Sequence, residues 1–201
     1  MILHENLIKF QFLIGKKLKF NYAPHKAFLT KYYINTMNQD KNLTNFQSVG
    51  EFHEVFGHPN PPTLQKNILT DNPKMVQFRL SLIREEFKEL VVGVEENNMI
   101  EVLDGLGDIL YVVYGMGQAL GIDLDRVFKI VHASNMSKLC KNEQEAKDTI
   151  EHYKTLPGFE NVPVGYRLAP DGERYVMYNI DTSKILKSKY FTLPDFSDML
   201  A

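Results

Sequence analysis

The chain has 201 residues, of which 44% are hydrophobic and 24% charged, and a formal net charge of −2. This length allows one domain with a sizeable core, and the charge balance lacks the basic excess of a typical nucleic-acid-binding protein. No apolar run approaches the roughly 18 to 20 residues that span a bilayer. A single cysteine, Cys140, excludes an intrachain disulfide framework. We therefore expect a cytoplasmic protein that binds neither nucleic acid nor membrane.

Residues 1–45 are predicted to form an N-terminal extension. Between residues 6 and 39 the chain carries several lysines and no acid, which sets this stretch apart from everything downstream. A targeting or membrane-surface segment and a loosely docked extension both fit such a composition, and we favour the extension.

Residues 46–56 show the three- and four-residue apolar spacing of a short helix, which Gly57 ends. Asn72 followed by Pro73 predicts the start of a longer helix that runs to about residue 95. Its predicted apolar stripe is Val76, Leu80, Ile83, Phe87, Leu90, Val91 and Val94. A short turn at residues 97–98 then makes a second long helix, residues 99–120, its antiparallel neighbour.

The rest of the chain predicts two more helices and a hairpin. Gly121 and Asp123 separate the second long helix from one that runs to about residue 138, and Asn142 with Glu145 predicts another to Tyr153. Residues 162–168 and 174–180 read as a β-hairpin, followed by an extended polar tail. We therefore predict an all-α helical bundle over residues 46–156, with a small C-terminal β-hairpin and tail over residues 157–201.

Two acidic clusters occupy the predicted helix pair. They are Glu85, Glu86 and Glu89 on the first helix, and Glu101, Asp104 and Asp108 on the second. Residues three, four and seven apart share one helix face, so each cluster forms a row of carboxylates. Facing rows of carboxylates repel one another, which favours a hard divalent cation between them, Mg²⁺ or alternatively Mn²⁺.

The two rows differ in their surroundings. The first, with Arg84 and Lys88 beside it, fits a solvated charged face. The second lies in a strongly apolar run, with no Lys or Arg between Asn98 and Asp125, and buried carboxylates need partners. We therefore expect the second row to be buried, and it carries the argument for a metal.

Spacing argues against two other metal chemistries. His53, Glu54 and His58 suggest a zinc hydrolase, but its second histidine must follow the first by four residues, where Gly57 stands. A di-iron carboxylate bundle needs Glu-x-x-His on two helices, and none of the six histidines follows a glutamate at that distance. We expect these histidines to be surface or packing residues.

The acidic pattern resembles a known family. E-E-x-x-E over residues 85–89 and E-x-x-D over residues 101–104 resemble the MazG-like all-α nucleoside triphosphate pyrophosphohydrolases. The runs DILYVVYG (108–115), GID (121–123) and SNMSK (134–138) are similar to the branch that contains phosphoribosyl-ATP pyrophosphohydrolase. The likeness covers residues 46–153.

This resemblance implies Mg²⁺-dependent cleavage of the α–β phosphoanhydride of a nucleotide, which yields a monophosphate and pyrophosphate. It also implies a homodimer or homotetramer whose chains share the site. The implied metal ligands are Glu86, Glu89, Glu101, Asp104 and Asp108. The implied catalytic acids are Glu85, Glu86 and Glu89, with Glu85 as a base or as a group behind the ligands. Asn135 and Lys138 are the implied substrate contacts, although a helix cap and a helix-end charge explain them equally well.

One position departs from the family pattern. In many relatives the acid pair ends at the aspartate before the Ile/Leu-Leu-Tyr run, here Asp108, and its partner would stand at residue 105. Gly105 occupies that position. Either Glu101 with Asp104 or Asp104 with Asp108 then supplies the pair. The departure also leaves open a nucleotide- or metal-binding helical module that has lost catalysis.

Overall fold

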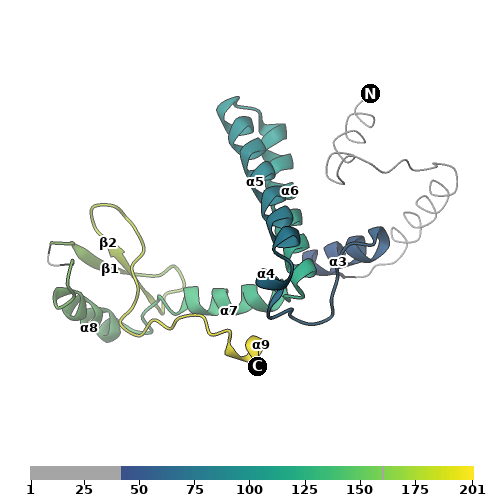
Figure 1. Cartoon of the computed structure of the whole chain (residues 1–201). Helices are drawn as coiled ribbons and strands as arrows, with labels where there is room; N and C mark the ends of the chain where they lie inside the picture. The colour runs from purple at the N-terminus through teal and green to yellow at the C-terminus, as the bar shows by residue number, and fades with distance from the viewer. Residues whose placement is uncertain (1–41, 160) are drawn as a thin grey trace, which may run out of the picture. The chain divides into compact units, whose positions relative to one another are not determined.

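The computed structural model describes residues 42–159 and 161–201, and Figure 1 shows their helices and strands. The elements are α3 (Asn45–Phe56), α4 (Ile68–Asp71), α5 (Pro73–Glu95), α6 (Met99–Leu120), α7 (Leu124–Met136), α8 (Glu143–Lys154), β1 (Val164–Leu168), β2 (Tyr175–Asn179) and α9 (Ser197–Leu200). The predicted fold class, helical with a small C-terminal hairpin, is confirmed. Most of the predicted N-terminal extension, residues 1–41, lies outside the described residues.

The described residues form two compact units. The first comprises residues 42–61 and 67–121, and the second comprises residues 62–66 and 122–201. The predicted domain division at residue 156 remains a prediction. In the part of the chain that the structure describes, none of the helices combines the length and apolar character needed to cross a bilayer.

The first unit is built on α5 and α6, which lie side by side and run antiparallel in Figure 1, with α3 packed on α6. The Asn72 side chain accepts a hydrogen bond from the Met75 N–H, which caps α5 ahead of Pro73. Asn97 has a φ of 52° in the turn, and Asn98 caps α6. These local signals place both long helices where the sequence predicts them.

The second unit has its own core. Cys140, Ala146 and Met177 are buried together where α8 packs on the hairpin, and β1 pairs antiparallel with β2 from Val164 opposite Asn179 to Leu168 opposite Tyr175. Cys140 is therefore a packing residue. The short helices α4 and α9 were not predicted, because each has only four residues, too few to show a helical periodicity.

Candidate metal and nucleotide site

Close backbone contacts fix the register of α5 against α6. An added Cβ on Gly93 would lie 2.9 Å from the Cβ of Glu101, and one on Gly105 would lie 3.1 Å from the Cα of Leu90. The two helices run antiparallel, so seven residues back from Gly93 on α5 correspond to seven residues forward from Glu101 on α6. This count places Glu86 opposite Asp108. The two acidic clusters therefore meet across this helix pair.

Glu86 is the buried centre of these acids. It is only 5% exposed, and burial, followed by the charges of neighbouring carboxylates, raises its pKa to about 7. The acids that act on it are, in decreasing order, Asp108, Glu89, Glu85 and Asp104. The structure thus brings five of the six predicted acids into one electrostatic group, in which removing a proton from Glu86 is unfavourable without a compensating cation.

Glu101 stands apart from this group. It lies against Gly93, which is two turns beyond Glu86 along α5, or about 10 Å by helix rise. It is also absent from the acids that raise the pKa of Glu86. Which of the six carboxylates bind a metal stays a prediction.

We expected the second row of acids to be buried and the first to be solvated. For the single chain this prediction is wrong. Glu86 of the first row is buried, whereas Asp104 of the second is exposed and Asp108 is half-buried. The reason lies in the helix face that the contact uses. The buried positions of α5 are Val76, Arg79, Leu82, Glu86 and Gly93, whereas Phe87 and Val94 of the predicted apolar stripe are exposed.

Gly105 is expected to be required for this contact. Gly105→Ala would place a methyl group 3.1–3.2 Å from the backbone N and Cα of Leu90, which can yield only if the helices separate. We expect the free energy of unfolding to fall by about 1–3 kcal/mol. Gly107→Ala is the matched control, since an added Cβ there meets nothing within 4 Å, and it should stabilise α6 by up to about 1 kcal/mol. Urea unfolding measures both, and equal gains in the two variants would contradict the close contact.

The predicted substrate contacts Asn135 and Lys138 belong to the second unit, at the end of α7. The Lys138 ammonium donates a hydrogen bond to Asn135 Oδ1 at 2.7 Å, and the neighbouring Ser134 hydroxyl donates to the Thr192 carbonyl. These contacts are local to the second unit. The role of both residues in substrate binding therefore stays a prediction.

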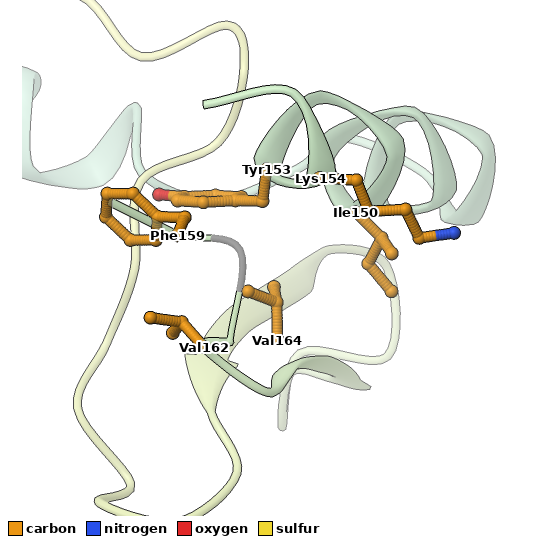
Figure 2. Close-up of a pocket in the computed structure, with 6 residues that line it drawn as sticks. All are labelled: Ile150, Tyr153, Lys154, Phe159, Val162 and Val164. Carbon is orange, nitrogen blue, oxygen red and sulfur yellow. The ribbon is translucent and has the colours of Figure 1, made fainter. Parts of the chain in front are cut away.

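The second unit also carries a pocket between α8 and the hairpin, shown in Figure 2. Its lining residues are Ile150, Tyr153, Lys154, Phe159, Val162 and Val164. The Tyr153 hydroxyl donates to the Lys187 carbonyl and so is already used in packing. Among the described residues that line it, most are apolar and none is a carboxylate.

The acids on α5 and α6 fit a hard cation by their chemistry. All are oxygen donors, and the pKa of Glu86 is raised first by burial and then by the neighbouring carboxylate charges, which a divalent ion would offset. Within residues 42–159 and 161–201, however, no three His, Cys, Asp or Glu side chains are already gathered closely enough to hold a metal ion. Ligation would therefore require these side chains to turn toward the ion.

A second polar group lies in the first unit where α3 and α6 meet. His53 is 1% exposed, and its Nδ1 lies 2.7 Å from the Pro59 carbonyl oxygen, which can only accept a hydrogen bond. Nδ1 therefore carries the proton. Burial, with smaller contributions from the charges of Arg79 and His58, lowers the pKa of His53 to about 4. The expected packing role of His53 agrees with its burial.

The lowered pKa of His53 predicts that the protein loses stability in acid. A group whose pKa falls on folding stabilises fully above its unfolded pKa and loses that contribution as pH drops through its folded pKa. For His53 the loss runs from about pH 6.5 down to about pH 4. As the pH is lowered through this range, the melting temperature should therefore fall more steeply in wild type than in His53→Asn. The asparagine amide can still donate a hydrogen bond to the Pro59 carbonyl. Thermal melts at half-unit pH steps measure the difference, and parallel profiles would contradict it.

Comparison with known proteins identifies the family of this chain. A model of the phosphoribosyl-ATP pyrophosphohydrolase family matches residues 49–135, from α3 to α7. The uncharacterized protein L479 of Acanthamoeba polyphaga mimivirus is 43% identical over 246 aligned positions, which cover 81% of this chain and 98% of that protein. The helices that carry the acidic group thus define a pyrophosphohydrolase-type fold. The chain belongs to the phosphoribosyl-ATP pyrophosphohydrolase family, and the resemblance drawn from the sequence is confirmed.

Proposed function

We propose that the protein is a Mg²⁺-dependent nucleotide pyrophosphohydrolase. It cleaves the α–β phosphoanhydride of a nucleoside triphosphate or related nucleotide and releases a monophosphate and pyrophosphate. Clearing of noncanonical or excess nucleotides is the role that such a reaction would serve. The observation that carries this proposal is Glu86, buried on the α5–α6 pair with its pKa raised to about 7 among four other carboxylates.

The acids would have two roles, metal binding and proton transfer. Glu86, Glu89, Asp104 and Asp108, with Glu101 in the first turn of α6, would hold Mg²⁺, and Mn²⁺ is the alternative ion. Bound metal would screen the phosphate charge, polarise the phosphoryl oxygens and lower the pKa of an attacking water. Glu85 is exposed beside Glu86 and would accept a proton from that water. Asn135 and Lys138 would contact the substrate, the lysine through a phosphate.

We also propose a homodimer or homotetramer. The α5–α6 pair of a single chain exposes a row of large apolar side chains, namely Phe87, Val91, Val94, Ile100, Leu103, Leu106 and Leu110. Monomeric soluble proteins seldom leave contiguous apolar patches of this kind in water. A second copy of the same helix pair would cover the row and enclose the neighbouring acids, which raises their affinity for a cation.

The test is the release of pyrophosphate from the full chain with Mg²⁺, over a panel of ribo- and deoxyribonucleoside triphosphates and phosphoribosyl-ATP. We expect at least one nucleotide to yield equal amounts of monophosphate and pyrophosphate, and EDTA to stop the reaction. Release of orthophosphate would indicate cleavage at a different bond. Turnover of none would support the alternative that Gly105 suggests, a nucleotide- or metal-binding helical module without catalysis.

A further inference from the structure

The C-terminal segment of residues 187–192 binds back onto the end of α7. The Ser134 hydroxyl donates a hydrogen bond to the Thr192 carbonyl at 2.8 Å, and the Thr192 N–H donates to the Ser137 hydroxyl oxygen at 3.0 Å. The Thr192 hydroxyl donates to the same oxygen at 3.2 Å. Two serines one helical turn apart thus hold both main-chain groups of a residue that lies 55 positions after Ser137. We call residues 187–192 the C-terminal strap.

Further hydrogen bonds hold the other end of the C-terminal strap. The Ser188 N–H donates to the Lys138 carbonyl at 3.2 Å, and Ser188 is only 3% exposed. The Lys189 N–H donates to the hydroxyl oxygen of Thr149, a fully buried residue of α8, at 3.1 Å. Hydrogen bonds weaken steeply when their angle changes, so these contacts fix both the position and the orientation of the strap.

The strap binds the turn that carries the two proposed substrate contacts. Asn135 follows Ser134 in the last turn of α7, and Lys138 follows Ser137, which is the C-cap residue. Helix ends fray, because their last carbonyls lack partners within the helix. Asn135 is exposed and Lys138 is half-buried, so their side chains stay open to a ligand. The strap can therefore hold this turn in place without covering it.

The arrangement of the two substrate contacts depends on that turn. The Lys138 ammonium donates to Asn135 Oδ1 at 2.7 Å, and the main chain between the two residues is the part that Ser134 and Ser137 attach to Thr192. Side chains that are already ordered lose less entropy when a ligand binds. An attached turn should therefore bind substrate more tightly than a frayed one.

We propose that the C-terminal strap is a positioning element of the substrate site. It acts through Ser134 and Ser137, which hold Asn135 and Lys138 in the arrangement that binds substrate, and the strap itself does not contact the substrate. This inference rests on the proposed function, because it takes Asn135 and Lys138 as substrate contacts. It gives a role to a segment that the sequence indicated only as part of an extended polar tail.

The test compares Ser137→Ala with a matched control, Thr155→Ala. Each variant removes the hydroxyl of a helix C-cap residue that donates to the carbonyl three residues earlier, at Ser134 and at His152. Of the two hydroxyls, that of Ser137 alone also accepts hydrogen bonds from Thr192. We expect Ser137→Ala to raise the KM for the best nucleotide by about 5-fold and to leave kcat unchanged. Thr155→Ala should change neither, as measured by pyrophosphate release from the full chain with Mg²⁺.

Two further variants separate positioning from a general structural effect. Ser137→Thr keeps the hydroxyl and should retain the KM of wild type. In a Lys138→Met background, Ser137→Ala should raise KM by a smaller factor than in wild type, because one of the two side chains that the strap positions is already lost. An equal factor in both backgrounds would overturn the positioning role, since the strap would then act on something other than these contacts.

The same assay distinguishes failure of this inference from failure of the proposed function. Equal KM values in wild type, Ser137→Ala and Thr155→Ala would overturn the positioning role alone, because pyrophosphate release would continue. A wild-type chain that releases pyrophosphate from none of the nucleotides would overturn the proposed function, and this inference with it.

Discussion

Glu86→Gln is expected to lower the rate of pyrophosphate release by at least about 100-fold while the helical fold persists. Glu86 is buried between α5 and α6 with four carboxylates acting on it, so it is the acid most dependent on a cation. Glutamine keeps the shape of the protonated acid but cannot supply a negative oxygen to Mg²⁺. Among the neighbouring acids, Asp108 has the largest effect on the pKa of Glu86. Asp108→Asn should therefore also lower the rate of pyrophosphate release. The assay uses the best nucleotide at saturating Mg²⁺.

Thermal unfolding distinguishes a lost metal site from a damaged fold. A group whose pKa rises on folding contributes its stability below the unfolded pKa and loses it as pH rises through the folded pKa. For Glu86 this loss runs from about pH 4.5 to about pH 7. At pH 8 without metal, Glu86→Gln should therefore melt at a higher temperature than wild type. Mg²⁺ should raise the melting temperature of wild type but not of the variant.

Glu95→Gln supplies the matched control. Glu95 lies on the same helix and is exposed, and it is not among the acids that act on Glu86. The control should release pyrophosphate and respond to Mg²⁺ as wild type does. Full activity in both Glu86→Gln and Asp108→Asn would show that the buried acidic group is not the metal centre.

Lysine at both Ile100 and Leu103 is expected to convert an oligomer into a 23.2 kDa monomer. These side chains are 76% and 66% exposed in the single chain, so their loss should do little to the fold of one protomer. Covering one such side chain in each of two copies contributes about 3–6 kcal/mol per dimer, which corresponds to at least about 100-fold in the dissociation constant. Light scattering after size-exclusion chromatography, over a range of protein concentrations, measures the mass.

Leu193→Lys is the control for added surface charge, since Leu193 is equally exposed but belongs to the second unit. Its mass should match that of wild type. A wild-type chain that remains monomeric at all concentrations would contradict the proposed assembly. Loss of pyrophosphate release together with dissociation would indicate that the site depends on both copies.

The helix boundaries were predictable because their signals are local. Asn72 and Pro73 start α5, Gly121 ends α6 in the left-handed conformation with a φ of 68°, and Asp123 caps α7. Each depends on a few neighbouring residues and on backbone conformations that only certain side chains tolerate or stabilise. The hairpin was predictable for the same reason, from a Val- and Tyr-rich pattern broken at Pro170-Asp171-Gly172.

The choice of buried face was not predictable, because it depends on the partner helix. Hydrophobic spacing favoured Phe87 and Val94 as core residues of α5, yet both are exposed in the single chain. The two backbones approach closely at Gly93 and Gly105, and the face of α5 that is buried carries Glu86 and Arg79 instead. No hydropathy pattern marks an arginine that folding buries.

The glycine contacts between α5 and α6 set the charge density of the acidic group. Gly105 lies beside the acids and Gly93 lies two turns beyond Glu86 along α5, and both keep the two helix axes close. The repulsion among those carboxylates is thus imposed by the main chain, before any side chain turns toward an ion. If these acids bind Mg²⁺ as proposed, a single methyl group at residue 105 would change the cation affinity while every acidic residue stays in place.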